Sequence, residues 1–456
     1  DGTRVWALMP PLNYNGNPKP KNLVEQWRLF QQKDKVDEVI FSFGWGDGGG
    51  GPTTHMLEYG KRLQNMVGVP KAKFDRTQDA IDRMERQVAF KDLPVWNGEL
   101  YLELHRGCQT TQARTKRNNR KCEVMLHDAE LLSTLAMLHG GPYEQDELYE
   151  AWKIVLTNQF HDILPGSSIN EVYLVADEDY AKARALIAGV RDRAMAHLAS
   201  RIDTSGEGTP IVVFNTLGWV RSDVVKVKFK APSKGFAILD SEGNPVPFQQ
   251  VAKDEYLFEA AAVPPMGHAV YRVAPSGEPF EPSGSLKVSP AGLENDFVRV
   301  RLDKKGHIIG IYDKMAEREV LAKGERGNVL QLFDDRPYAH DAWDFDFNFE
   351  AIGWEPDVAG PVEVVETGPV RAVLRTKRKT DKSTIDQDII LHANSPRIDF
   401  ATRVDWWEKR VLMKVAFPVD VRSSRATYEI QFATIEQTTH DNTNFDLARF
   451  EMAEHK

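Results

Sequence analysis

The stretch Ala176–Ala194, ADEDYAKARALIAGVRDRA, repeats a small, apolar or aromatic residue at every third or fourth position. The repeating positions are spaced 4, 3, 4, 3 and 4 residues apart, and they are Ala176, Tyr180, Ala183, Ile187, Val190 and Ala194. This spacing places all six side chains on one face of an α-helix. The stretch therefore predicts a long amphipathic helix with one buried face.

Two earlier stretches repeat this spacing. Their members are Met125, Ala129, Leu132 and Ala136, then Leu148, Trp152, Val155 and the polar Gln159. Gly140-Gly141-Pro142 and Pro165-Gly166 provide the breaks between successive helices. We therefore predict a three-helix bundle over residues 97–203. We also expect Ser168 and Glu171 to form a capping box at the start of the third helix.

Residues 1–96 alternate between strand-like and helix-like segments. Val36–Phe43 (VDEVIFSF) predicts a strand and is followed by the glycine-rich loop Gly44–Thr53. Val69–Phe74 predicts another strand, and Gln78–Phe90 predicts a helix. Strand, loop and helix in succession are typical of β/α units around a parallel sheet. This region, residues 1–96, is therefore expected to form β/α units around a parallel sheet.

The helical period ends near residue 209, and short strand-like segments with polar turns follow. They are Val212–Phe214, Val224–Phe229, Leu257–Val263, Phe297–Leu302, Val362–Val365, Ala372–Thr376 and Ile398–Val404. This pattern predicts antiparallel β-sandwich domains. A stretch rich in Pro, Ser and Gly, Ala274–Pro290, divides a small β domain (204–280) from a β-sandwich domain (281–456). The fold class is thus multidomain, with α/β, α and β parts in order.

Length and composition limit the possible functions. The chain has 456 residues, which suggests roughly three domains of about 150 residues. Its net charge of −9 argues against a nucleic-acid surface, and no apolar run approaches the roughly 20 residues that span a membrane. Cys108 and Cys122 are the only cysteines, which favours a reducing compartment such as the cytoplasm. The chain starts at Asp1 without a leader and stops after ordered-looking sequence, so we expect both ends to be cut.

His161 and Asp162 are the first candidate site residues. They lie in Asn158–Ser168 (NQFHDILPGSS), where the second helix is expected to end. A neutral imidazole is a common zinc ligand, and a carboxylate beside it could accept hydrogen bonds from the hydroxyls of a polar substrate. The alternative is a histidine that only interacts with the dipole of the helix C-terminus. One histidine is not a metal site, because zinc takes three or four ligands.

Asp47 is the second candidate, in the loop GWGDGGGGPT. The loop lacks the Gly-Lys-Ser/Thr ending of a phosphate-binding loop. Trp45 beside a carboxylate suits a sugar site, and desolvation by the ring would raise the pKa of the acid. The alternative is a turn aspartate among glycines.

Three further segments leave two interpretations open. His105 and Arg106 either reach a functional site or fix the chain where it enters the helical bundle. We favour the structural role at this junction. The aspartate-rich segment Asp334–Phe347 either binds calcium or lines the rim of a substrate site, or else it is a solvent-exposed loop. Trp354–Asp357 (WEPD) looks like a glycosidase nucleophile motif, but it lies within the β region, where a turn is expected.

Several long motifs in one order resemble glycoside hydrolase family 38, the retaining α-mannosidases, and in particular its cytosolic and bacterial branch. The motifs are Gly44–Thr53, Asn97–Ala113 (NGELYLELHRGCQTTQA), Asn158–Ser168, Asp341–Asp346 (DAWDFD) and Tyr428–Phe432 (YEIQF). The resemblance covers essentially the whole chain. It implies that residues 1–96 are the C-terminal part of a β/α catalytic domain, followed by a three-helix bundle and β-sandwich domains.

The resemblance also implies roles for residues. His161 matches a family zinc ligand and Asp162 a substrate contact, while Asp47 is our candidate acid/base. The family's other zinc ligands, a His-x-Asp pair and the nucleophilic Asp, have no counterpart here. The resemblance thus implies a fragment that lacks the N-terminal half of the catalytic domain and the C-terminal end, and that is inactive alone.

For the complete protein, the resemblance implies zinc-assisted double displacement that releases terminal α-mannosyl residues from oligosaccharides or glycans. The expected partner is an α-mannoside glycan rather than nucleic acid or a membrane, and a homo-oligomer is compatible with the sequence. One alternative is a non-catalytic carbohydrate-binding fragment. Another is a family member that acts on a different glycoside.

Overall fold

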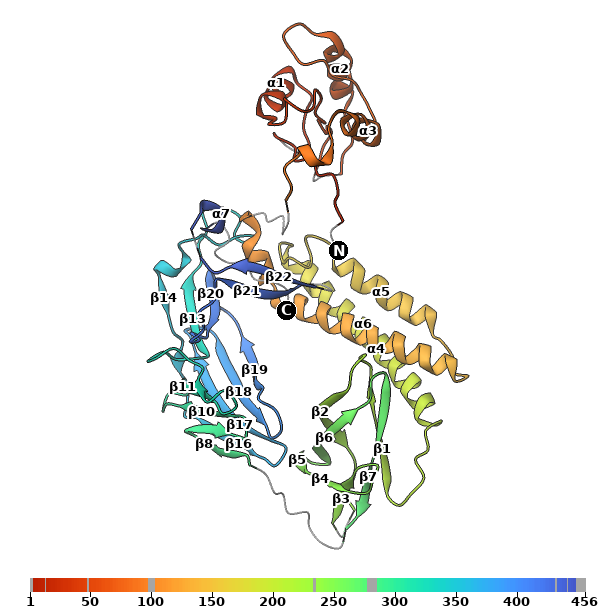
Figure 1. Cartoon of the computed structure of the whole chain (residues 1–456), viewed down its shortest axis with the longest axis vertical. Coiled ribbons are helices and arrows are strands. Elements are labelled where there is room, and N and C mark those ends of the chain that lie inside the picture. The colour runs from red at the N-terminus through yellow and green to blue at the C-terminus, as the bar shows by residue number, and fades with distance from the viewer. Residues whose placement is uncertain are drawn as a thin grey trace. The chain divides into compact units, whose positions relative to one another are not determined.

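The computed structural model describes residues 3–12, 14–46, 49–96, 103–232, 235–276, 285–430, 433–440 and 442–447. The chain divides into two compact units, Asp1–Leu100 and Tyr101–Lys456, and each is described by itself (Figure 1). Several stretches named above lie outside the described residues: Asp47, residues 97–102 and 431–432 of two motifs, and residues 277–284 of the expected linker.

The first unit is helical in its described part. Its elements are α1 (Pro20–Leu29), α2 (Thr54–Arg62), α3 (Thr77–Gln87) and the short 3-10 helices η1 (Leu63–Asn65) and η2 (Phe90–Asp92). Thr53 caps α2, because its hydroxyl accepts a hydrogen bond from the Met56 amide at 3.4 Å. Buried side chains on α3 and after α1, including Phe30, Val36 and Met84, form the core.

The strands expected at Val36–Phe43 and Val69–Phe74 are wrong, and the described residues of this unit contain no strand. A strand needs a neighbouring strand that accepts and donates its backbone hydrogen bonds. Here the buried side chain of Gln26 takes part of that role, because its amide donates to the Ile40 carbonyl at 3.0 Å. The β-branched run therefore packs on helices instead of joining a parallel sheet.

Three long helices of the second unit lie where the residue spacing predicts them. After the 3-10 segment η3 (Glu103–Gln109) come α4 (Ala113–Leu138), α5 (Gln145–Asn158) and α6 (Asn170–Ala199). The helices pack side by side (Figure 1), and all six positions of the repeating pattern in α6 are buried. Buried residues of α4 and α5, such as Leu126 and Val155, meet this face.

The backbone conformation at the end of α4 requires the glycine pair Gly140-Gly141. Gly140 has φ +83°, its amide donates to the Met137 carbonyl at 3.0 Å, and the Gly141 amide donates to the Ala136 carbonyl at 2.8 Å. This pair of bonds is a Schellman motif, which satisfies two carbonyls at the helix end.

The expected capping box is wrong. Helix α6 starts after Ile169, which makes no side-chain cap hydrogen bond. The Ser168 hydroxyl donates instead to the Asp162 carbonyl at 2.7 Å. The helix begins at Asn170, so Ile169 rather than Ser168 occupies the N-cap position.

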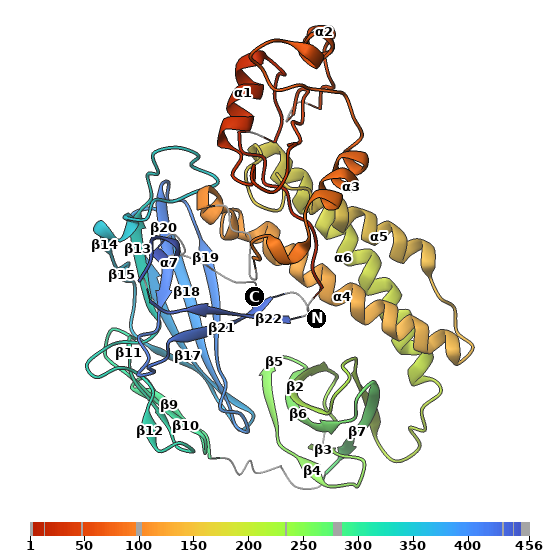
Figure 2. The ribbon, with the colours of Figure 1, turned by 45° about the horizontal axis from the view of Figure 1, so that its top comes forward.

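The small β module consists of two antiparallel sheets. One contains β1 (Thr209–Asn215), β7 (Gly267–Pro275), β3 (Phe236–Leu239) and β4 (Pro245–Val246), and the other contains β2 (Arg221–Lys228), β6 (Glu255–Val263) and β5 (Phe248–Ala252). Their inner faces share one core, which includes Ile238, Phe258 and Tyr271. Figure 1 and Figure 2 place these green strands at the end of α4 and α6, where Phe214 packs on Leu132 and Leu198.

The larger β region is also antiparallel. Its strands are β8 (Lys287–Ser289), β9 (Gly292–Glu294), β10 (Val298–Leu302), β11 (Ile308–Asp313), β12 (Arg318–Glu319), β13 (Val329–Asp334), β14 (Gly353–Trp354), β15 (Asp357–Val358), β16 (Glu363–Thr367), β17 (Arg371–Lys379), β18 (Thr384–His392), β19 (Ile398–Asp405), β20 (Val411–Ala416), β21 (Arg425–Ile430) and β22 (Ala433–Thr438). The short helices η4 (Phe349–Ala351) and α7 (Asn444–Leu447) complete it.

Two five-stranded sheets of this region form a sandwich. One has the order β12-β11-β10-β9-β8, and the other has β15-β17-β18-β19 with β16 paired to β17. Residues of both, such as Val300 and Leu374, share one core. Glu355-Pro356 connects β14 to β15, which agrees with a turn at the WEPD sequence. None of the helices in the described ranges is long and apolar enough to cross a membrane.

Candidate functional site

His161 lies in the loop that follows α5, and its ring is open to solvent. The side chain is 79% exposed, and Nε2 lies 3.5 Å from the Asp162 carboxylate. The Phe160 ring packs beside the imidazole with a centroid distance of 4.3 Å. The imidazole and the carboxylate thus lie together at the surface, where both can reach a cation or a polar ligand.

The loop closes on itself through Asp162. The Asp162 carbonyl accepts a hydrogen bond from the Ser168 hydroxyl, and the Ser168 amide donates to the Tyr173 hydroxyl at 2.9 Å. Tyr173 is buried on α6. These bonds tie the chain that directly follows His161 to the start of the third helix.

Lys116 of α4 fixes the other side of the loop. Its ammonium group donates to the carbonyls of Leu164 at 2.9 Å and Pro165 at 3.1 Å, and also to the Thr111 carbonyl. Burial lowers the pKa of Lys116 to about 8. Sequence reasoning missed this residue, since a lysine in a helix is ordinarily solvent-exposed and its partners lie about 48 residues away along the chain.

Two residues of η3 contact the aspartate-rich segment of the β region. The His105 ring stacks on Trp343 with centroids 5.0 Å apart, and the Arg106 guanidinium lies 3.5 Å from the Asp344 carboxylate. Only 10% of the Arg106 side chain and 17% of Asp344 are exposed. Both residues therefore join η3 to the β region at a largely buried contact.

Backbone bonds strengthen this contact. The Gly107 amide donates to the Trp343 carbonyl at 2.8 Å, and the Thr111 hydroxyl lies 3.2 Å from the Ala342 carbonyl. Three motifs that are far apart in the sequence therefore converge: η3 and the turn after it, the His161 loop and residues 342–344.

Asp335 is a second residue that sequence reasoning did not single out. Burial, and to a lesser extent the carboxylates of Asp341, Asp334, Asp346 and Asp344, raise its pKa to about 6. Its Oδ1 is buried without a hydrogen-bond partner among the described residues. The dense run of aspartates was the available signal, but which of them is buried depends on the fold.

The described residues supply only part of a metal site. His161 offers one donor that suits zinc, an imidazole nitrogen, and the Asp162 carboxylate lies beside it. No group of three or more His, Cys, Asp or Glu side chains in the described ranges is placed to hold one metal ion. His161 thus fits one position in a larger ligand set rather than a complete site.

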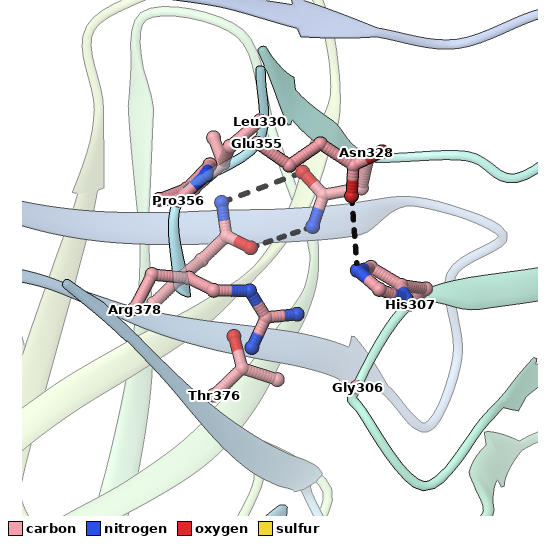
Figure 3. Close-up of a pocket in the computed structure, with 9 residues that line it drawn as sticks. Gly306, His307, Asn328, Leu330, Glu355, Pro356, Thr376 and Arg378 are labelled. Carbon is pink, nitrogen blue, oxygen red and sulfur yellow. Dashed lines mark hydrogen bonds and ion pairs between the residues drawn. The ribbon is translucent and has the colours of Figure 1, made fainter. Parts of the chain in front are cut away.

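A cavity in the β-sandwich lies among polar side chains, as Figure 3 shows. His307 Nε2 lies 3.5 Å from Glu355, and Arg378 is 8% exposed, so that burial lowers its pKa. The cavity measures about 10 Å³, room for one water molecule, so we interpret it as an internal polar network.

A larger hollow of about 470 Å³ lies between the bundle and the small β module. It is lined by residues such as Leu135, Phe214 and Met266. Its size suits a ligand, but neither His161 nor Asp162 lines it.

Comparison with known families gives three successive matches. The model of the glycosyl hydrolases family 38 N-terminal domain matches residues 1–99, that of the alpha mannosidase middle domain matches 103–198, and that of the family 38 C-terminal domain matches 293–456. His161 and Asp162 lie within the match to the middle domain.

Curated relatives match over the whole chain. The chain is 33% identical to alpha-mannosidase 2C1 of Homo sapiens over an alignment of 468 positions, which covers 100% of this chain and 42% of that protein. It is 32% identical to alpha-mannosidase G of Dictyostelium discoideum, over 100% of this chain and 45% of that protein. The chain thus spans less than half the length of these relatives.

A solved structure shares the fold. The crystal structure of an alpha-mannosidase from Enterococcus faecalis V583 matches with a TM-score of 0.73 at 17% identity, covering 95% of this chain and 58% of that chain. Matches to three successive domains of one family, together with these relatives, show that the chain belongs to glycosyl hydrolase family 38.

Proposed function

We propose that the whole protein is a zinc-dependent retaining α-mannosidase that releases terminal α-mannosyl residues from oligosaccharides or glycans. The observation that carries the proposal is the solvent-open imidazole of His161 with a carboxylate 3.5 Å away, in a chain of this family. The names of the relatives at 33% and 32% identity support the substrate class.

In this proposal, His161 donates a ring nitrogen lone pair to zinc, and Asp162 accepts hydrogen bonds from sugar hydroxyls. When bound, zinc supplies a positive charge that binds sugar hydroxyls and stabilises charge in the transition state. The hydrogen bonds to the Asp162 carbonyl and from the Ser168 amide hold the backbone of this loop in place before substrate arrives.

The acid and base steps need two carboxylates about 5–5.5 Å apart in a retaining enzyme. We propose Asp47 as the group that first protonates the leaving oxygen and then takes a proton from water. We assign no residue of this chain as the nucleophile. A cytoplasmic location and a homo-oligomer remain further predictions.

The test is His161→Ala in the full-length protein. We expect the variant to lose stoichiometric zinc, measured by elemental analysis, and to lose turnover of an aryl α-mannoside, because zinc ligands are rarely replaced by solvent without loss of affinity. Retention of one zinc per chain by the variant would contradict the assignment.

His127→Ala is the matched control. His127 also precedes an aspartate, is 61% exposed and lies 3.6 Å from the Asp128 carboxylate, but on the surface of α4. We expect this variant to keep both zinc and turnover. Binding of mannosides by a wild-type protein that shows no turnover would instead support the carbohydrate-binding alternative.

A further inference from the structure

The ammonium group of Lys116 is fully engaged by backbone carbonyls. A lysine ammonium carries three N–H donors, and here they face the carbonyls of Thr111, Leu164 and Pro165. Lys116 forms no ion pair with another residue in the described ranges. These carbonyls stabilise its positive charge, whereas burial disfavours the charged form and lowers the pKa of Lys116 to about 8.

The carbonyls belong to two segments that are pressed together. Gly166 has φ +98°, and a Cβ added there would lie 2.6 Å from the Thr111 carbonyl oxygen. The His161 loop thus approaches the turn after η3 at backbone distance, and Lys116 bridges the two segments at this point.

The other backbone bonds inside the loop are local. The Ile163 amide donates to the Phe160 carbonyl at 2.9 Å, and the Gly166 amide donates to the Ile163 carbonyl at 3.1 Å. Such bonds set the shape of the turn but do not fix its place on α4. Lys116 links the loop to α4 at Leu164 and Pro165, a few residues after His161.

We propose that Lys116 is a positioning residue, which holds the His161 loop against α4 so that the imidazole is set for its metal before the metal arrives. The inference rests on the proposed function of His161. It predicts that removal of the ammonium group loosens the loop while the helices remain packed, since Lys116 is not among the buried residues that form the helical core.

The first experiment uses this chain without metal. In Lys116→Met, which keeps the length of the side chain, we expect the amides of Ile163, Leu164 and Gly166 to exchange with solvent faster by about tenfold or more. Core amides of α4 and α6 should exchange as in the wild type. The control is Lys121→Met, at an exposed position of the same helix. Unchanged loop exchange in Lys116→Met overturns the inference.

The second experiment uses the full-length protein. We expect Lys116→Met to weaken zinc affinity by about 10- to 100-fold, the range typical for loss of a residue that orients a metal ligand, while the metal-free protein keeps its helical content. Lys116→Arg keeps the charge and should recover part of the affinity. Wild-type zinc affinity in Lys116→Met overturns the inference.

Two further variants keep the outcomes distinct. If His161→Ala loses zinc and Lys116→Met does not, only the role of Lys116 fails; if His161→Ala keeps zinc, the proposed function fails. Should Lys116→Met not fold, Gly166→Ala pushes the loop off Thr111 while Lys116 is intact. We expect the same faster loop exchange and weaker zinc binding, and wild-type behaviour of Gly166→Ala overturns the inference.

Discussion

At the scale of single residues, the environment of Asp335 sets its charge. The carboxylate has one oxygen buried without a hydrogen-bond partner among the described residues, and it faces further carboxylates. Its pKa therefore rises from 3.8 to about 6. Because the unfolded chain ionises more readily, ionisation of Asp335 costs folding free energy at neutral pH.

The sign of the pH dependence follows. Below about pH 4, Asp335 is protonated in both the folded and the unfolded protein and does not affect the free energy of unfolding. As the pH rises through 6, the free-energy cost of ionising this carboxylate in the folded protein develops fully. Asp335→Asn should thus raise the free energy of unfolding at pH 8 by about 1–3 kcal/mol and by less at pH 5. Urea unfolding at pH 5–8 measures this, with the exposed Asp381→Asn as control. An equal gain at pH 5 and pH 8 contradicts the prediction.

At the scale of elements, the end and the interior of the long helices make opposite demands on glycine. Gly140 adopts φ +83° in the Schellman motif, and a Cβ there would meet only the Arg201 side chain at 3.8 Å. Gly140→Ala should therefore cost about 1–2 kcal/mol for conformational reasons alone. Gly189→Ala, inside α6, should instead stabilise by about 0.5–1 kcal/mol. Chemical denaturation of both variants tests the pair, and the same sign of change in both would refute the prediction.

The same elements show what sequence can and cannot predict. The helix spacing identified the buried face of α6 because local periodicity alone determines which side chains share a face. The strand expected at Val36–Phe43 failed because β propensity does not supply a partner strand. In the site, the sequence predicted His161 at the end of the second helix, and it lies three residues beyond the end of α5. Nothing in the sequence indicated Lys116, whose partners are backbone carbonyls brought near by folding.

At the scale of the whole second unit, the β modules are joined by a buried glutamine. Gln249 of β5 is 7% exposed, and its carbonyl oxygen accepts hydrogen bonds from the Val370 and Arg371 amides, both at 3.1 Å. Its amide donates to the Glu366 carboxylate at 2.8 Å. One side chain of the small module thus satisfies three groups of the larger sandwich.

Gln249→Ala would leave these groups without their partner in a place that water reaches poorly. We expect the free energy of unfolding of the β modules to fall by about 1–3 kcal/mol, because an unsatisfied buried amide keeps its full desolvation penalty. The neighbour Gln250 is exposed, and its amide bonds only to the Ala252 carbonyl of the same strand, so Gln250→Ala should change stability by less than about 0.5 kcal/mol. Calorimetry of both variants gives the comparison. Equal losses would mean that truncation of β5, rather than the bridge between modules, determines the effect.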